Sequence, residues 1–308
     1  MAKGWNLIID VAKCSGCYNC ALATKDEHIG NDFPGYCAPE PAQGHHWIRI
    51  ERKVRGSAPV VDVAYLPTMC NHCDAAPCVQ AAKGPAIVKR DDGIVLISPE
   101  HAKGRRDLVG SCPYGAIWWN DELQLPQKWT FDAHLLDNGW RTTRAAQACP
   151  NDVMRVISLE QSDMKTLAAN EGLEVLKPEA RTLPRVYYKN LHRFQGAFIA
   201  GKVLHLAAGK VDCTDRAHVV LSQGSKDIAA GETDAFGEFK FDGLACDGGS
   251  YVVRASREDQ GSAQCTVQLG RSVYLGTMLL NSGTPEARAD SHEPAPTNRM
   301  TETRSSKT

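Results

Sequence analysis

The chain has 308 residues and a formal net charge of −1, and this length suffices for two domains with a substantial core. Neither its charge balance nor any run of like charges predicts a nucleic-acid interface or binding to a membrane surface. No stretch approaches the roughly 18 apolar residues that would indicate a membrane span. The first residues, MAKGWNLIID, show no signal-peptide core, so we expect a cytoplasmic protein.

Short apolar strands alternate with loops rich in Gly, Pro and Asp over the first 160 residues. Their composition and length predict strands at 5–13, 46–54, 93–99 and 153–159. Cysteine-rich loops lie between these strands. Such an arrangement is typical of a ferredoxin-like iron–sulfur domain, so we expect an α+β fold class with this domain at residues 1–160.

Residues 161–195 form a different kind of segment. The pattern predicts one short helix at 163–176, in which Gly172 disturbs the last turn. Residues 177–194 contain two prolines and several aromatic side chains. We interpret them as an extended arm that lies on another surface; packing on its own domain is the alternative.

Residues 196–280 change to a period of two, with turn residues every eight to twelve positions. This pattern predicts strands at 197–206, 217–223, 238–244, 250–256 and 263–269, and hence a small all-β immunoglobulin-like sandwich. No catalytic constellation occurs in this module, so we expect a docking or structural role. The last segment, 281–308, is polar and rich in Pro, Ser and Thr, and we expect a disordered tail.

Twelve cysteines are many for a cytoplasmic chain, in which clustered thiols usually indicate metal binding. Eight of them fall in patterned positions: Cys14, Cys17, Cys20, Cys70, Cys73, Cys78, Cys112 and Cys149. The other four are scattered, and we expect them to be small buried hydrophobic residues: Cys37, Cys213, Cys246 and Cys265.

The stretch CSGCYNC supplies three cysteines of a ferredoxin run, but Thr24 stands where a fourth would follow. In two-cluster ferredoxins that fourth cysteine belongs to the other cluster, and a proline follows it. Cys112 and Cys149 are each followed by proline. Two triplets and two single Cys-Pro pairs therefore complete two sets of four thiolates, although spacing alone does not decide which single joins which triplet. Zinc sites prefer two cysteine pairs, so the pattern favours [4Fe–4S] clusters over zinc.

This arrangement resembles the four-cluster ferredoxin-like subunits of molybdenum enzymes in the dimethyl sulfoxide reductase family. In that family the first cysteine motif pairs with the fourth and the second with the third. The resemblance implies one cluster on Cys14, Cys17, Cys20 and Cys149, and a second on Cys70, Cys73, Cys78 and Cys112. It also implies that two further clusters have been lost as complete sets. Thr24, Trp129, Asp132 and Ala145 hold the ligand positions of one, and Ala82 with the cysteine-free segment 97–111 those of the other.

Longer segments carry a closer resemblance, among them GHHWIRIERKVRG, DDGIVLISPEHAKGRRDL and PRVYYKNLHRF. They resemble the small subunits of pyrogallol–phloroglucinol transhydroxylase and resorcinol hydroxylase over most of residues 1–280. The resemblance implies a large catalytic partner that holds molybdenum on two pterin cofactors and hydroxylates a polyphenol. The present chain would contain no catalytic residue and would pass electrons through its clusters. The transhydroxylase subunit keeps the cluster whose ligand positions are held here by Thr24, Trp129, Asp132 and Ala145. The resemblance therefore leaves open which reaction the complex catalyses and which acceptor takes the electrons.

Two alternatives keep the clusters but change the role. One is the iron–sulfur subunit of another molybdopterin enzyme, such as a respiratory reductase, and the other is a structural docking subunit whose clusters are not redox-active. Five histidines lie near the cysteine motifs, and we expect core or surface placement for them rather than hydrogen bonds to sulfur: His28, His45, His46, His72 and His134. Trp118 and Trp119 are expected to pack beside a cluster.

Overall fold

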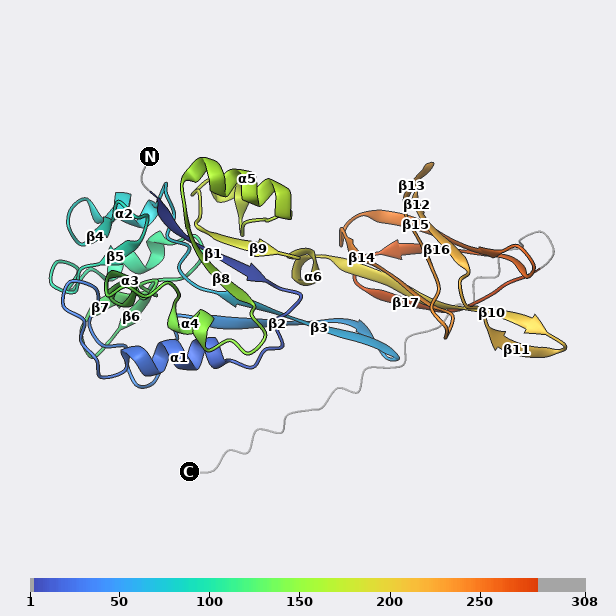
Figure 1. Cartoon of the computed structure of the whole chain (residues 1–308), viewed down its shortest axis with the longest axis horizontal. Helices are drawn as coiled ribbons and strands as arrows, with labels where there is room; N and C mark the ends of the chain where they lie inside the picture. The colour runs from blue at the N-terminus through green and yellow to red at the C-terminus, as the bar shows by residue number, and fades with distance from the viewer. Residues whose placement is uncertain (1–2, 282–308) are drawn as a thin grey trace, which may run out of the picture. The chain divides into compact units, whose positions relative to one another are not determined.

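The structure is a computed structural model that describes residues 3–281 (Figure 1). The chain divides into two compact units. The first comprises Met1–Ile199 with Lys240–Gly248 and Leu269–Tyr274, and the second comprises the remaining segments from Ala200 onward. The predicted boundaries at 160 and 195 both fall inside the first unit. Apart from Asn281, the predicted disordered tail at 281–308 lies outside the described residues.

A three-stranded sheet forms the centre of the first unit, and β1 (Gly4–Asp10) is its middle strand. On one side β8 (Met154–Leu159) pairs with β1 in the antiparallel sense. On the other side β9 (Val186–Lys189) pairs with it in the parallel sense. Leu7 and Ile9 of β1 are fully buried, because a middle strand covered on its faces keeps apolar side chains out of water.

Around this sheet lie three hairpins and several short helices. The hairpins are β2 (Arg49–Ser57) with β3 (Val60–Thr68), β4 (Ile87–Lys89) with β5 (Val95–Ile97), and β6 (Trp118–Asn120) with β7 (Leu125–Gln127). The helices are α1 (Asn19–His28), α2 (Pro77–Ala82), the 3₁₀ helix η1 (Arg106–Ser111), α3 (Ala133–Asp137) and α4 (Arg144–Gln147). Every predicted strand of this part therefore has a counterpart, with shifted ends.

The segment after β8 differs from its prediction in two ways. Helix α5 (Gln161–Glu171) ends earlier than expected, because Gly172 adopts a left-handed conformation and its N–H donates to the Ala168 carbonyl. The 3₁₀ helix η2 (Pro178–Ala180) follows it. Residues 177–194, interpreted as an arm on another surface, instead supply β9 to the central sheet and the short helix α6 (His192–Gln195). The alternative, in which this segment packs on its own domain, is the correct one. Tyr188 of β9 is fully buried in the first unit.

From residue 197 the chain is all β within the described residues, in two four-stranded sheets. One contains β11 (Lys210–Cys213), β10 (Ala197–Ala207), β14 (Glu238–Leu244) and β17 (Val273–Leu279), and the other contains β13 (Lys226–Glu232), β12 (His218–Gln223), β15 (Gly249–Arg257) and β16 (Gly261–Leu269). The five predicted strands are present. The sequence did not predict β11, β13 and β17, and most of the side chains of β11 and β13 are exposed and lack an apolar alternation.

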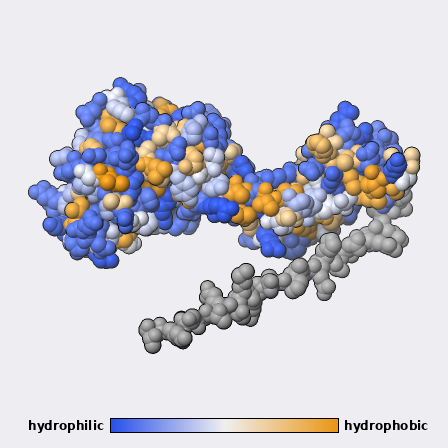
Figure 2. Space-filling view, turned by 90° about the horizontal axis from the view of Figure 1, so that it is seen from below, coloured by the Kyte–Doolittle hydropathy of each residue, from blue (hydrophilic) through white to orange (hydrophobic). Residues whose placement is uncertain are grey.

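Among the described residues, no helix combines the length and apolar character needed to cross a membrane. The face drawn in Figure 2 is mainly hydrophilic, with separate hydrophobic patches.

The place of β9 in the core gives a test of the fold. Tyr188 is fully buried, and its hydroxyl donates to the Pro67 carbonyl at 3.0 Å. We expect Tyr188→Ala to cost about 3–5 kcal/mol by leaving a cavity, and to lower the thermal midpoint by about 10 °C. Circular dichroism on anaerobically purified protein measures this change. Tyr188→Phe keeps the ring and loses only one hydrogen bond worth about 1 kcal/mol; equal midpoints for the two variants would contradict the assignment.

Candidate metal centres

The pairing of β1 with β8 brings the first cysteine run to Cys149. In the antiparallel register Ile9 lies opposite Met154, and the Asp10 N–H donates to the Val153 carbonyl at 2.8 Å. The chain that leaves β1 and the chain that enters β8 therefore lie at the same end of the sheet. Asn151 ties the two loops together, since its amide donates to the Lys13 carbonyl and to the Ser15 hydroxyl.

Four cysteines line one cavity at this end: Cys14, Cys17, Cys20 and Cys149. Ile50, Pro67 and Met154 supply apolar wall to the same cavity. The loop can approach because Gly16 has a φ of +71°, and a Cβ there would lie 2.4 Å from the Tyr65 ring. Cys20 is buried, whereas Cys17 is exposed, so one edge of this cavity lies at the protein surface.

Hydrogen bonds to sulfur surround this first cavity. The Val153 N–H donates to the Cys149 Sγ at 3.4 Å, and the Gly16 and Ala21 amides donate to Cys14 and Cys20. Burial raises the pKa of the Cys20 thiol to about 12, and the neighbouring cysteines add to that rise. Four thiolates are therefore costly here unless positive charge, such as that of bound iron, compensates them.

The second cysteine group lines a separate cavity: Cys70, Cys73, Cys78 and Cys112. The first two follow the end of β3, Cys78 lies in α2, and Cys112 directly follows η1. Val95 and Ile117 supply apolar wall. Cys70, Cys73 and Cys78 are buried, so this cavity is less open to solvent at its cysteines than the first.

Two polar side chains that the sequence analysis missed act on this second group. Lys128 lines the cavity, is almost fully buried, and donates to the Trp129 carbonyl at 3.1 Å. Burial raises the pKa of Cys78 to about 11, and the Lys128 cation opposes that rise. The Thr182 hydroxyl donates to Cys73 and also contacts the Tyr114 hydroxyl at 2.5 Å. Neither residue belongs to a cysteine motif, so the sequence carried no signal for either role.

The residues present fit two iron–sulfur clusters. All twelve cysteines are free thiols, and each cavity has four of them together with donors aimed at sulfur, as cysteine-bound clusters require. Within residues 3–281, no three Cys, His, Asp or Glu side chains converge as they would around a single metal ion. The thiols instead surround a shared space.

The four scattered cysteines line neither cavity. Cys37 is buried, as predicted. The other three, Cys213, Cys246 and Cys265, are partly exposed rather than buried. That expectation was wrong for them because Cys213 and Cys265 lie on strands with solvent-exposed side chains and Cys246 lies in the turn between β14 and β15.

The positions of the missing ligands are filled by packed side chains. Thr24, Trp129, Asp132 and Ala145 are all buried, as is Ala82 beside the second group. Asp132 accepts the Arg144 N–H at 2.7 Å. Burial raises the pKa of Asp132 and lowers the pKa of the neighbouring His28, so both groups are driven toward their neutral forms.

Three of the five histidines are core residues, as expected: His28, His72 and His134. The His72 Nδ1 accepts the Val95 N–H at 3.0 Å, and its ring packs edge-on against Trp129 and Phe131. The hydrogen bond and the ring contacts of His72 are therefore to a backbone amide and to aromatic side chains. Trp118 packs against the large core cluster of the first unit; that Trp118 and Trp119 lie beside an iron–sulfur cluster stays a prediction.

Comparison with known proteins identifies relatives of both parts of the chain. Residues 61–159 match the 4Fe-4S dicluster domain family. Over 277 residues the chain is 44% identical to the pyrogallol hydroxytransferase small subunit of Pelobacter acidigallici, covering 89% of this chain and 98% of the relative. The arsenate respiratory reductase iron–sulfur subunit of Shewanella sp. is 29% identical, with 94% of its length matched to 59% of this chain. A subunit of the tetrathionate reductase of Salmonella typhimurium is 30% identical over 60% of this chain and 72% of its own length.

Lys128 gives a test of the electrostatics at the second cavity. Because a nearby cation stabilises an added electron, Lys128→Met should lower the reduction potential of a cluster held there by on the order of 100 mV. The cluster on the other cysteines should change much less. A redox titration followed by electron paramagnetic resonance measures both, with the exposed Lys165→Met as control. Equal shifts of the two potentials, or none, would contradict this role.

Proposed function

The chain belongs to the iron–sulfur subunits of molybdenum oxidoreductases, and on that premise we propose that it is the electron-transfer subunit of a molybdopterin-dependent hydroxylase or transhydroxylase of polyphenols. Its partner is a large catalytic subunit that holds the molybdenum bis-pterin cofactor and binds a substrate such as resorcinol or pyrogallol. This chain carries electrons and contributes no catalytic residue.

The observation that carries the proposal is the grouping of the eight patterned cysteines around two cavities, four to each. We assign one [4Fe–4S] cluster to Cys14, Cys17, Cys20 and Cys149, and the other to Cys70, Cys73, Cys78 and Cys112. When bound, each cluster takes up and releases one electron at a time. The chain holds the clusters by thiolate, shields them with apolar wall, and sets their potentials through amide N–H groups and Lys128.

The extent of the similarity favours a polyphenol enzyme over a respiratory reductase. The arsenate reductase subunit is matched over almost its whole length by 59% of this chain, so about two fifths of the chain has no counterpart in it. The match to the pyrogallol hydroxytransferase subunit covers 89% of the chain, and therefore includes much of the all-β part. We interpret this part as an immunoglobulin-like sandwich with a structural or docking role.

The first cysteine group offers a surface at which the catalytic partner can exchange electrons. Cys17 is exposed, and two apolar side chains beside it, Tyr18 and Leu22, are 47% and 59% exposed. Apolar side chains around a solvent-facing redox site are typical of an interface with another protein. We therefore place the large subunit on this face. None of the twelve cysteines, all within residues 3–281, pairs in a disulfide, which suits a reducing compartment, and we place the complex in the cytoplasm.

Serine replacements of the two single ligands test the cluster assignment. The wild-type chain, purified anaerobically with its partner, should contain about eight irons from two four-iron clusters. Cys149→Ser should remove the cluster of the first cavity and Cys112→Ser that of the second, each leaving about four irons. Cys213→Ser and Cys265→Ser should keep all of the iron. Loss of both clusters in each single variant, with the fold intact by circular dichroism, would contradict the assignment.

The proposed partner is tested by what co-purifies. A large subunit with molybdenum, together with reduction of the preparation by resorcinol or pyrogallol, supports a polyphenol enzyme. If this chain contains iron but purifies without molybdenum or a large subunit, the cluster assignment holds and the hydroxylase assignment is wrong.

A further inference from the structure

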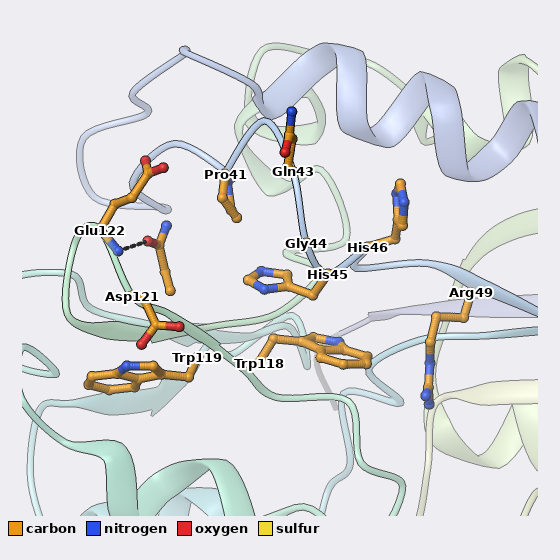
Figure 3. A pocket seen from close by; sticks show the side chains of 11 residues that line it. Pro41, Gln43, Gly44, His45, His46, Arg49, Trp118, Trp119, Asp121 and Glu122 are labelled. Carbon is orange, nitrogen blue, oxygen red and sulfur yellow. Dashed lines mark hydrogen bonds between the residues drawn. The ribbon is translucent and has the colours of Figure 1, made fainter. Parts of the chain in front are cut away.

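A surface pocket of about 510 Å³ lies in the first unit, apart from the two cysteine cavities (Figure 3). The loop before β2 with Arg49, and strand β6 with the turn after it, build its walls. In Figure 3, Trp118 and Trp119 lie along one side, Pro41 and Gln43 lie on the other, and His45 stands between them. Pockets of this size hold small organic ligands.

Flat rings and cations form the part of the pocket around the two tryptophans, and the carboxylates of Asp121 and Glu122 line the part beside it. The His45 ring is stacked on Trp118, with centroids 5.6 Å apart and an interplanar angle of 11°. The Arg49 guanidinium lies 4.9 Å from the centre of the Trp118 ring, and the Arg106 guanidinium lies over Trp119. Such a wall binds planar conjugated rings by stacking.

Two polar atoms in this wall have no hydrogen-bond partner, the indole Nε1 of Trp119 and the Nε2 of His45. Buried polar atoms are normally paired, and an indole N–H can only donate. Burial and the nearby Lys25 cation lower the pKa of His45 to about 4, so its ring is neutral at pH 7. A carbonyl oxygen of a ring ligand supplies the acceptor that the Trp119 N–H lacks, and the neutral His45 Nε2 needs an acceptor in the tautomer that protonates it.

The pocket wall is continuous in sequence with the walls of both cysteine cavities. Ile117 lines the second cavity and the next residue, Trp118, lines the pocket. Ile50 lines the first cavity and the preceding residue, Arg49, lines the pocket. Consecutive Cα atoms are about 3.8 Å apart, so one backbone segment separates the pocket from each cysteine cavity at these two points.

We propose that this pocket binds a planar redox ring with carbonyl oxygens, of the flavin or quinone class, as the external electron acceptor of the complex. The inference rests on the proposed electron-transfer role and supplies the exit route that the role requires. Oxidation of the polyphenol at the partner subunit releases two electrons to the clusters. Two successive one-electron transfers and two protons from solvent then reduce the bound ring to its dihydro form, and the clusters return to their oxidised state.

Equilibrium dialysis of the anaerobically purified complex tests binding directly, with flavin mononucleotide in one arm and 1,4-naphthoquinone-2-sulfonate in the other. We expect saturable binding of at least one probe, and the arms show which ring class is bound. Trp118→Ala and His45→Ala should weaken binding at least tenfold. Trp140→Ala, a truncation of a tryptophan that does not line the pocket, should leave binding unchanged.

A second readout uses the clusters. Reoxidation of the dithionite-reduced complex should saturate with probe concentration in the wild type and in Trp140→Ala, and lose saturation in His45→Ala. His45 lies on a surface loop, so this variant remains informative if Trp118→Ala does not fold. Absence of saturable binding in the wild type, or equal binding in the pocket variants, would overturn the inference. Iron content is measured in every sample. Missing iron contradicts the proposed function, whereas retained iron without probe binding contradicts only the proposal that the pocket binds a redox ring.

Discussion

The antiparallel pairing of β1 with β8 is the constraint on which the rest of the first unit depends. Cys149 lies far along the chain from Cys14, Cys17 and Cys20, and only this register brings it to their cavity. A shift of one residue would turn every side chain of β8 to the other face. The sheet that creates the register is completed by β9, which arrives after a further helix. The cysteines of the first cavity therefore come from segments at the two ends of residues 14–154, whereas the cysteines of the second follow β3, lie in α2 and follow η1.

The family resemblance implies that two cysteine groups are retained and that the other ligand positions are replaced, and one physical rule accounts for such a pattern. A cluster site with only some of its ligands could not hold its iron, and the remaining cysteines could stay buried only as neutral thiols. Here the replaced positions carry Trp129, Ala145 and other buried side chains, so the core closes over them. Asp132 is the exception, a fully buried carboxyl held by the Arg144 amide. The result is a unit with two cysteine cavities and a continuous core around them.

Local patterns were sufficient to predict about half of the strands and both cysteine groups, because motifs such as CSGCYNC are contiguous in sequence. The family resemblance implied the same two groups of four that line the cavities. Features that depend on distant contacts were not predictable. The parallel pairing of β9 with β1 leaves no local mark, so residues 177–194 were misread as an arm. Lys128, Thr182 and the Trp118 pocket likewise arise only when separate segments meet, and β13 was missed because its side chains are exposed.

In the proposed function, electrons from a polyphenol reach the two clusters assigned to this chain. The most direct measurement is electron paramagnetic resonance of the co-purified complex after anaerobic addition of resorcinol or pyrogallol, with no acceptor present. We expect signals of reduced clusters to appear in this chain, and we expect Cys112→Ser and Cys149→Ser each to remove one of them. Clusters that dithionite reduces but that stay oxidised during turnover of either polyphenol would contradict it, and would leave the clusters a structural role.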